Sequence, residues 1–441
     1  MIPILTCGEM RESDAKALGH RGEDALVRLA GTSVALEAKK MLGSCYGARV
    51  AVVVGPGLNG ADGQVAAEWL ASRGARVDVR DVKHMPSELR GFDLVIDAAF
   101  GIGLSRAYIA PKVASGTRVL AVDVPSGIDA DTGLVLGEPL VATVTLALGA
   151  LKPGHLMGPA TRYVGELRFA GLNIVTTFSN GLIVDDDLAA MVHFDNIDHK
   201  WSHAVEALVG STLMPGAAEL VLNGALAGGA SMIRLSSRGD VASLVTLPPE
   251  VVHSTDTKVD HRCRAVVAGP GLGPNAAEWL HDRLANLNLP VVLDADGLDR
   301  SMIEELSPRD ASWVLTPHEG EFVRLSGQPL GANRFDAVRE MAQSTGCVVL
   351  LKGPTTVIAN PAGILRVVTS GTPALATAGT GDVLAGLIAA TIARGHSPFE
   401  AAALAAHLHG RAGSRLHAYG TAMDVVSNLH RVLDELGGSQ S

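Results

Sequence analysis

Short apolar runs, each ending in a loop of glycine and polar residues, constrain the fold of this chain most. Three lie in the first half and four in the second: Arg49–Val54, Phe92–Ile96, Arg118–Val122, Arg264–Ala268, Leu289–Leu293, Trp313–Leu315 and Cys347–Leu351. Runs that are apolar throughout are typical of parallel strands buried on both faces. The carboxyl ends of such strands meet at one edge of the sheet, where these folds bind ligands. The sequence therefore predicts an α/β protein with its polar loops gathered at strand ends.

The length of the chain predicts two domains, because 441 residues exceed what one core ordinarily holds. Apolar periodicity fades over residues 176–200, where acidic residues collect. We place the boundary near Asn180, which gives one domain over residues 1–180 and another over 181–441. The acidic trio at 185–187 is interpreted as a solvated face or a helix start.

A glycine-rich loop follows the first strand of the first half. This loop, residues 55–63, carries two polar side chains, Asn59 and Asp62, and we expect a helix over 64–73 after it. Ahead of the strand, residues 11–40 have the apolar spacing of a helix. A strand, a glycine loop, a helix and a second strand form a right-handed βαβ unit of the kind that binds nucleotides.

Polar side chains at three strand ends of the first half are expected to converge. Asp97 and Asp123 follow the next two strands, and Ser126 lies three residues beyond Asp123. With Asn59 they would supply amide, carboxylate and hydroxyl oxygens to one crevice, a donor set that suits a hard cation. The alternative is that the two aspartates only accept hydrogen bonds from amides of their own loops.

In the second half, the segment Ala378–Gly386 has two glycines around a threonine, then a carboxylate and an apolar run. Gly379 and Gly381 allow a tight turn whose N–H groups point at one spot, at the positive end of the helix that follows. Such a spot holds an anion, most often a phosphate, and Asp382 beside it could accept the proton of an attacking hydroxyl. Equally, the glycines could end a loop, with Asp382 favouring the helix start.

Two further strand ends of the second half carry candidate ligand contacts. Lys352 follows a buried strand and precedes a glycine and two threonines, which favours a phosphate contact. His318 lies in the loop after another strand, where a substrate contact is expected. Zinc is not expected there, because no second histidine follows at the spacing of a metalloprotease motif. His407, His409 and His417 near the end of the chain are expected to pack or to face solvent.

Composition excludes several classes of partner. Hydrophobic residues make up 47% and charged residues 19% of the chain, which excludes disorder. A net charge of −10 argues against nucleic acid or an anionic membrane as partner, so local loops must bind any phosphate. The four cysteines lie far apart, the first residues lack the pattern of a signal peptide, and no apolar run could span a bilayer. We therefore expect a cytoplasmic location.

The loops of the first half resemble those of the YjeF family N-terminal domain, the NAD(P)HX epimerases. The motifs are GPGLNGADG at residue 55, DAAFGIG at 97 and DVPSGID at 123, within a resemblance over about Ile4–Asn173. It implies a Rossmann-like three-layer α/β/α domain, potassium on Asn59, Asp97 and Ser126, and Asp123 as the acid–base residue. It also implies that substrate lies against Leu58, Asn59, Gly60, Ala61, Asp62, Gly101, Ile102, Gly103, Leu104, Ser105, Arg106, Ala107 and Asp123.

The second half resembles the ADP-dependent NAD(P)HX dehydratases, which have a ribokinase-like α/β fold. The motifs are GPGLG, DADGL, TPHEGE, LKGPTT and GTGDVLAG, in order within about Asp195–Leu436. This resemblance implies that ADP, used as co-substrate with Mg²⁺, contacts Lys352, Gly353, Pro354, Thr355, Thr356, Gly379, Thr380 and Gly381. It places substrate on Ala217, Gly271, Gly273, His318 and Asp382, with Asp382 at the reacting hydroxyl.

Together the two resemblances imply a repair enzyme for hydrated nicotinamide nucleotides. It would interconvert the R and S epimers of NAD(P)HX and dehydrate the S epimer with ADP, releasing AMP and phosphate. The implied partners are NADHX or NADPHX and ADP, in a homo-oligomer of four or more chains. Two alternatives stay open: a ribokinase-like kinase of a vitamin-precursor alcohol, or a dehydratase with a non-catalytic first domain. The second arises because Leu58 and Ala61 stand where that family usually has asparagine and glycine.

Overall fold

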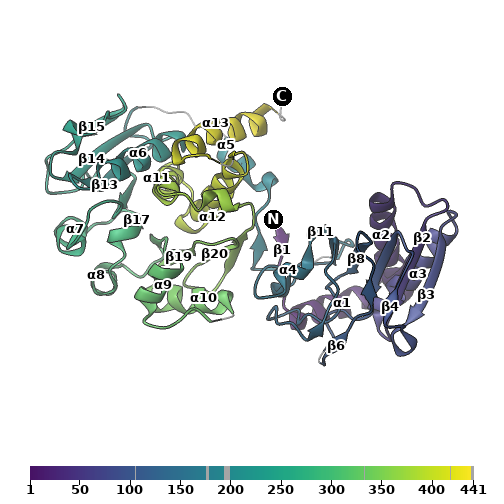
Figure 1. Cartoon of the computed structure of the whole chain (residues 1–441). Coiled ribbons are helices and arrows are strands. Elements are labelled where there is room, and N and C mark those ends of the chain that lie inside the picture. Colours follow the sequence, from purple (N-terminus) through teal and green to yellow (C-terminus); the bar gives the residue numbers. More distant parts are fainter. Residues whose placement is uncertain (105, 175–177, 193–198, 332, 418, 439–441) are drawn as a thin grey trace. The chain divides into compact units, whose positions relative to one another are not determined.

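A computed structural model describes residues 1–104, 106–174, 178–192, 199–331, 333–417 and 419–438 of the chain. Contacts between residues divide the chain into two compact units, Ile2–Ser179 and Asn180–Ser441. Each unit is a mixed α/β structure built on its own sheet (Figure 1), as the apolar runs predict. In the part of the chain that the structure describes, no helix combines the length and apolarity needed to cross a membrane.

The first unit is organised around a parallel sheet in the order β11-β10-β8-β5-β2-β3. Its strands are β2 (Arg49–Val54), β3 (Arg76–Asp81), β5 (Leu94–Ala98), β8 (Arg118–Val122), β10 (Val144–Leu148) and β11 (Glu166–Ala170). The central strands are buried on both faces, which explains why their sequences are mostly apolar. Because all the strands are parallel, the loops after β2, β5, β8 and β10 emerge at one edge.

Helices cover one face of this sheet, and the sequence predicted two of their boundaries wrongly. The single helix expected over 11–40 is two, α1 (Cys7–Arg21) and α2 (Glu23–Leu42), because Gly22 between them adopts φ of 79°. Helix α3 (Leu58–Ala71) begins six residues earlier than expected. Gly60 and Gly63 are therefore helical, and they serve close packing: a Cβ at Gly60 would overlap the Gly55 carbonyl oxygen, and one at Gly63 would lie 2.6 Å from the Ala98 methyl.

The opposite face of the same sheet packs against loops and short strands. An apolar cluster joins Ala51, Val53, Val95 and Val119 of the sheet to Leu89, Leu140 and Ala142. Two short parallel ladders lie in this region, β4 (Glu88–Leu89) with β7 (Lys112–Val113) and β6 (Tyr108–Ile109) with β9 (Gly137–Glu138). A single-turn helix, α4 (Thr161–Val164), precedes β11.

The sheet of the second unit contains, in order, β12-β21-β20-β19-β18-β17-β16-β13-β14-β15. The bounds are β12 (Gly181–Leu182), β13 (Ala204–Ser211), β14 (Met232–Arg238), β15 (Val251–His253), β16 (Ala265–Ala268), β17 (Val291–Leu293), β18 (Trp313–Leu315), β19 (Val348–Leu351), β20 (Thr356–Ala359) and β21 (Leu365–Val368). Strands β13 to β19 are parallel, and β20 runs antiparallel to both of its neighbours. The four loops predicted to lie at strand ends follow β16, β17, β18 and β19.

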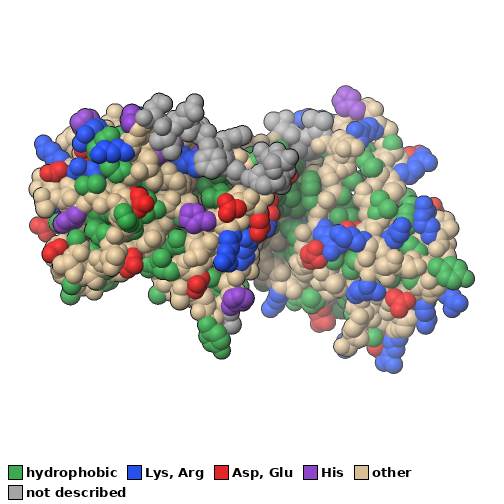
Figure 2. All heavy atoms as spheres, turned by 90° about the horizontal axis from the view of Figure 1, so that it is seen from above, with side chains coloured by type: hydrophobic (Ala, Val, Ile, Leu, Met, Phe, Trp, Pro, Cys, Tyr) green, Lys and Arg blue, Asp and Glu red, His purple; other side chains and the backbone are tan. Residues whose placement is uncertain are grey.

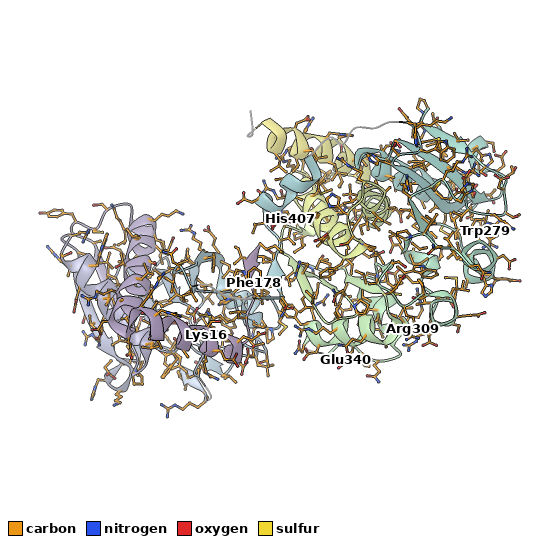
Figure 3. The ribbon with its side chains drawn as sticks, turned by 180° about the vertical axis from the view of Figure 1, so that it is seen from behind. Lys16, Phe178, Trp279, Arg309, Glu340 and His407 are labelled. Atoms are coloured by element: carbon orange, nitrogen blue, oxygen red, sulfur yellow. The ribbon has the colours of Figure 1, made fainter. Side chains whose placement is uncertain are left out.

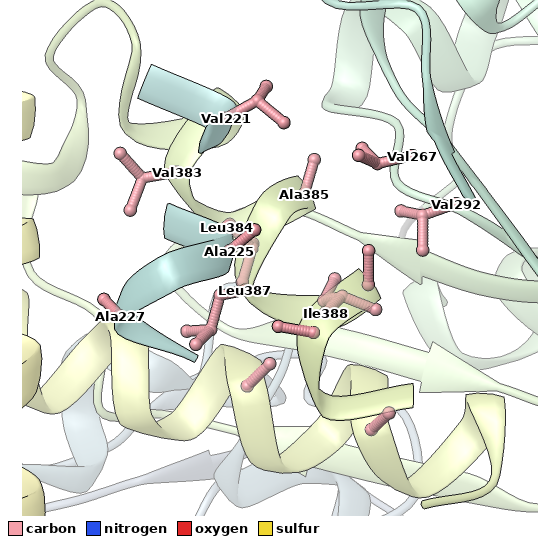
Figure 4. Close-up of a cluster of buried hydrophobic side chains, with 14 of the residues drawn as sticks. Val221, Ala225, Ala227, Val267, Val292, Val383, Leu384, Ala385, Leu387 and Ile388 are labelled. Carbon is pink, nitrogen blue, oxygen red and sulfur yellow. The ribbon is translucent and has the colours of Figure 1, made fainter. Parts of the chain in front are cut away.

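Four helices, α6 (Pro215–Ala227), α11 (Thr380–Ala393), α12 (Pro398–Gly413) and α13 (Ala422–Gly438), pack together on one face of this sheet. Figure 4 shows Ala385 and Ile388 of α11 between α6 and the sheet residues Val267 and Val292. Glycine lets the two helices approach closely, because a Cβ at Gly224 would overlap the Val383 carbonyl oxygen. This packing fixes the N-terminal end of α11, where the anion turn is predicted.

Helices α7 (Ala276–Leu284), α8 (Arg300–Leu306), α9 (Glu319–Ser326) and α10 (Arg334–Thr345) contribute a second apolar layer. Leu315 of β18 faces Ile303 of α8, Leu325 of α9 and Met341 of α10. Charged side chains of both signs are interspersed on the face drawn in Figure 2.

The first segment of the second unit is tied to α12 by charged groups. Asp185 accepts from His407 Nε2 at 2.9 Å and from the Arg411 guanidinium, and His407 lies on α12 (Figure 3). Asp187 accepts from the Val184 amide at 2.9 Å, and a short 3₁₀ turn begins at Asp185, ahead of α5 (Ala189–Val192). The acidic trio is thus a helix start, as predicted, and His407 packs rather than binding a metal.

Candidate active sites

In the second unit, the glycines of residues 378–381 form a turn at the N-terminus of α11. Gly379 has φ of 87°, and Thr380 Oγ1 donates to the Leu375 and Thr377 carbonyl oxygens at 2.7 and 2.9 Å, which fixes the turn. A Cβ built at Gly381 would lie 3.3 Å from Lys352 Nζ and 3.7 Å from Asp294 Oδ2. The positive end of the helix therefore faces Lys352 directly, without an intervening side chain on Gly381.

Lys352, after β19, is held by the carboxylate of Asp294, which follows β17 two strands away in the sheet. Its Nζ lies 2.7 Å from Asp294 Oδ1, and the Lys352 side chain is only 21% exposed. Burial lowers the pKa of Lys352, but the charge and hydrogen bond of Asp294 outweigh burial, so its pKa is raised overall. The amide of Lys352 donates to the Pro317 carbonyl oxygen at 2.9 Å, which brings its loop against the loop after β18.

Asp382, in the first turn of α11, has the electrostatics of a general base. Burial raises the pKa of its carboxyl to about 7, with the charge of Asp294 adding to burial and Lys352 opposing it. A carboxylate with a pKa near neutrality can accept and return a proton at physiological pH. Because Asp382 and Lys352 influence each other's pKa, the two share one site, as the sequence predicts.

Glu321 connects His318 to this pair. It raises the pKa of both Lys352 and Asp382, and its Oε2 accepts from the His318 amide at 2.8 Å. His318 caps α9 through Nδ1, which accepts from the Glu321 amide at 3.2 Å, and its side chain is 61% exposed. The imidazole is thus fixed by the cap while a large part of it faces solvent.

The remaining predicted residues of this unit lie in adjoining loops. A Cβ at Gly271 would lie 2.6 Å from the Ala217 methyl, and the Gly273 amide donates to Asp296 Oδ2 at 2.9 Å. Asp296 in turn raises the pKa of Asp382. Gly353, Pro354 and Thr355 form the turn between β19 and β20, and Thr356 begins β20. A Cβ at Gly353 would lie 2.8 Å from an Arg334 Nη, so the α10 arginine backs this turn.

Sequence reasoning missed three carboxylates of this site. Asp294, Asp296 and Glu321 all act on Asp382, yet only the motifs containing them were singled out. The signal was present, because all three follow strands that end beside the Lys352 loop. Among the described residues, no three His, Cys, Asp or Glu side chains are grouped so that they could hold a metal ion alone.

The first unit contains a cavity of about 740 Å³ at the predicted sheet edge. Of the residues predicted to contact substrate, those that line it are Leu58, Asn59, Asp62, Gly101, Ile102, Gly103, Leu104, Arg106 and Asp123. Gly60, Ala61 and Ala107 do not line the cavity, because Gly60 and Ala61 are turned away within the first turn of α3. Ser105 lies outside the described residues.

Asp123 lies at the inner end of this cavity in an unusual conformation, with φ of 64°. Its Oδ1 is ion-paired with Lys152 Nζ and also accepts from the Leu148 amide at 3.0 Å. Its carbonyl oxygen lies 2.7 Å from His155 Nε2, while His155 Nδ1 accepts from the Lys152 amide, so Nε2 is the donor. Burial lowers the pKa of His155 to about 4, which keeps this ring neutral. Lys152 and His155 were not assigned roles from the sequence.

Asp97, Ser126 and Asn59 lie at neighbouring strand ends, beside unpaired polar atoms. Asp97 is 1% exposed, its Oδ2 accepts from the Ser126 amide at 2.9 Å, and burial raises its pKa. Asn59 Nδ2 and the Tyr108 hydroxyl are buried without a hydrogen-bond partner among the described residues, and burial, with the charge of Asp97 added, raises the pKa of Tyr108. The Asp97 carboxylate and the Tyr108 hydroxyl oxygen are ligand types that suit a monovalent cation, whereas Asn59 Nδ2 is a hydrogen-bond donor. Asp97 also accepts loop amides, as the alternative interpretation expected.

Comparison with known proteins decides between the families that these sites could serve. A family model described as NAD(P)H-hydrate dehydratase matches residues 205–433, and the YjeF-related protein N-terminus model matches 23–90 and 80–154. The bifunctional NAD(P)H-hydrate repair enzyme Nnr of Mycobacterium tuberculosis (strain CDC 1551 / Oshkosh) is 37% identical over 432 residues, covering 89% of this chain and 90% of that protein. This chain belongs to the family of bifunctional NAD(P)H-hydrate repair enzymes. The Nnr protein of Mycobacterium leprae is 34% identical over 468 residues, 97% of each chain.

Solved structures place the second unit of this NAD(P)H-hydrate repair family member among ribokinase-like folds. The ADP/ATP-dependent NAD(P)H-hydrate dehydratase of Bacillus subtilis, co-crystallized with ATP and Mg²⁺, is 29% identical with a TM-score of 0.54. The match covers 59% of this chain and 100% of that chain. A ribokinase-like superfamily protein from Enterococcus faecalis V583 matches in fold with a TM-score of 0.53, 21% identity, and coverage of 59% and 98%.

Proposed function

We propose that this chain repairs hydrated NADH and NADPH, with residues 1–180 interconverting the R and S epimers and residues 181–441 dehydrating the S epimer. The observation that carries the dehydratase assignment is Asp382, a carboxylate with a pKa of about 7, beside the buried Lys352–Asp294 pair at the N-terminus of α11. A base, a cation and a helix N-terminus at one spot are what phosphoryl transfer requires.

Dehydration proceeds through a phosphorylated hydroxyl, because hydroxide is a poor leaving group. Asp382 accepts the proton of the C6 hydroxyl as that oxygen attacks the terminal phosphoryl group of ADP. The N–H groups of the turn at 379–381 and Lys352 stabilise the charge on the phosphate oxygens, and AMP leaves. Phosphate then departs from C6, C5 gives up a proton to that phosphate or to water, and the C5=C6 double bond forms, which regenerates NAD(P)H. The loop from Lys352 to Thr356 holds the nucleotide, with Ala217, Gly271, Gly273 and His318 against the substrate.

Magnesium fits this site together with the nucleotide. Three carboxylates act on Lys352 and a fourth, Asp296, acts on Asp382, and Mg²⁺ in such sites is held by one or two carboxylates plus phosphate oxygens. Asp296 would hold it, since it uses only Oδ2 on the Gly273 amide in the contact described above. When bound, the ion neutralises charge on the phosphates.

In the first unit, Asp123 is the acid–base residue and the cavity it lines holds the hydrated ring. Asn59, Asp97 and Ser126 would hold potassium, whose positive charge offsets the otherwise unpaired Asp97 carboxylate and orders the loop after β5. We place the enzyme in the cytoplasm as a homo-oligomer; its cysteines at 7, 45, 263 and 347 are buried and unpaired, which suits a reducing compartment.

Product analysis with a single S epimer tests the dehydratase assignment. The full chain, incubated with S-NADHX, ADP and Mg²⁺, is expected to yield AMP, phosphate and NADH in equal amounts. The NADH is followed by the rise in reduced-nicotinamide absorbance. A stable phosphate ester without that rise would instead identify an ordinary ribokinase-like kinase and contradict the proposal.

A further inference from the structure

A second carboxylate faces Asp123 across the cavity of the first unit. Asp62 lies on α3, one helical turn after Asn59, and lines the same cavity as Asp123. It is 7% exposed, and among the described residues it has no hydrogen-bond or ion-pair partner. Carboxylates this deeply buried are ordinarily paired or hydrogen-bonded, so the environment of Asp62 is unusual for a structural residue.

The two carboxylates have different surroundings. Asp123 is paired with Lys152. The carboxyl of Asp62 is instead buried, and the charges that act on it are the negative ones of Asp123 and Asp14. These causes raise the pKa of Asp62 to about 8, so its carboxyl is mainly protonated at neutral pH. The other charged groups lining the cavity are Arg11, Glu23 and Arg106. One cavity therefore holds a carboxylate paired with a lysine and a carboxylic acid, the arrangement by which environments assign base and acid roles.

We propose that Asp62 is the general acid that acts opposite Asp123, and that epimerisation opens and recloses the hydrated nicotinamide ring. The inference rests on the proposed epimerase function of this unit and adds to it a second catalytic residue and a reaction course. Asp62 is one of the residues that line the cavity, which places it within reach of the substrate.

The chemistry follows from the structure of the substrate, in which C6 carries a hydroxyl and is bonded to the ring nitrogen N1. Asp123 takes the hydroxyl proton, the C6=O bond forms, and the C6–N1 bond breaks with its electron pair going to N1. N1 receives the proton of Asp62, which leaves an open-chain aldehyde. Rotation about C5–C6 presents the other face of the carbonyl. N1 then attacks C6, Asp62 recovers its proton and Asp123 returns one to oxygen. No oxidant or further reactant is consumed.

The test compares Asp62→Asn with wild type in the full chain, without ADP so that dehydration is silent. Glu68→Gln, on the exposed side of the same helix, is the matched control. Separated R-NADHX is the probe, and the rate of S-epimer formation is followed by chromatography from pH 6 to 9.5. General acid catalysis contributes about 10²–10⁴-fold, so we expect Asp62→Asn to slow equilibration by about 100-fold or more with KM changed less than about threefold.

The pH profile separates an acid role from a structural one. Wild type and Glu68→Gln should lose rate as pH rises through about 8, when Asp62 loses its proton, and Asp62→Asn should lack this decline. A rate for Asp62→Asn within about threefold of wild type would overturn the proposal. So would a wild-type profile that does not decline up to pH 9.5, a result that decides the matter even if the variant misfolds. Failure of the wild-type chain to equilibrate the epimers at any pH would instead contradict the proposed epimerase function.

Discussion

Replacing Gly381 with alanine should separate nucleotide binding from stability. Gly381 lies in the first turn of α11, where alanine is favoured over glycine by up to about 1 kcal/mol. The added methyl would lie 3.3 Å from Lys352 Nζ, a tight contact that a shift of a few tenths of an ångström at the end of the flexible lysine side chain relieves. It would, however, occupy the space between the helix N-terminus and the lysine that a phosphate needs.

The expected loss follows from the hydrogen bonds that the methyl prevents. A hydrogen bond to a charged group contributes about 1.5–3 kcal/mol, so each one lost raises the KM for ADP by about 10- to 100-fold. The assay is dehydration of S-NADHX at varied ADP, with the melting temperature measured alongside. We expect a melting temperature equal to or above that of wild type and a greatly raised KM.

Gly379→Ala is the matched control two residues earlier. Gly379 has φ of 87° and a Cβ there would overlap the Leu220 side chain, so this variant should be destabilised. An unchanged KM for ADP in Gly381→Ala would refute the placement of the phosphate between α11 and Lys352. A destabilised Gly381→Ala would show that the contact with Lys352 is tighter than the structure indicates.

Three further predictions concern charge. Asp382→Asn should lower kcat for dehydration by about 100-fold or more. The kcat of the wild type should rise with pH through about 7, because Asp382 must be ionised to act as the base. A similar rise in the variant would contradict this role. Lys152→Met leaves the Asp123 carboxylate buried without its ion-pair partner, and should lower the free energy of unfolding of the first unit by about 3–5 kcal/mol. Hydrogen exchange in urea measures this loss, and unchanged protection of the amides would contradict it. Replacing K⁺ with a quaternary ammonium ion should slow epimerisation in wild type but not further in Asp97→Asn; an equal rate in both salts would remove potassium from the site.

Local patterns were sufficient to predict the sheets but not the helix boundaries around them. The strands at Arg49–Val54, Arg118–Val122 and Trp313–Leu315 occur with the predicted bounds, because a strand buried on both faces is apolar along its whole length. The start of α3 was misplaced because glycine indicates both tight turns and close packing, and only tertiary structure shows that Gly60 meets the Gly55 carbonyl. Gly22 shows the opposite case, because the apolar spacing of a helix continues across this glycine although the helix itself ends there.

For the sites, the sequence predicted residues that belong to motifs and missed their partners. Lys352 and Asp382 were expected in one cleft, and their mutual influence on pKa agrees with that. Asp294 and Lys152 were missed because pairing depends on how close the strand ends lie in space, which follows from sheet order rather than from order along the chain. The protonation state of Asp62 could not be predicted at all, since it depends on burial and on two aspartates distant in sequence.

The central claim is that one chain carries both repair activities, and a mixture of R- and S-NADHX with ADP, Mg²⁺ and K⁺ tests it most directly. The increase in reduced-nicotinamide absorbance is followed to completion, under conditions in which spontaneous epimerisation is slow. Two working units predict that both epimers are consumed, with AMP formed in equal amount to total NADHX. A reaction that stalls once the S epimer is exhausted would show that the first unit is silent, and no absorbance rise at all would contradict the dehydratase as well.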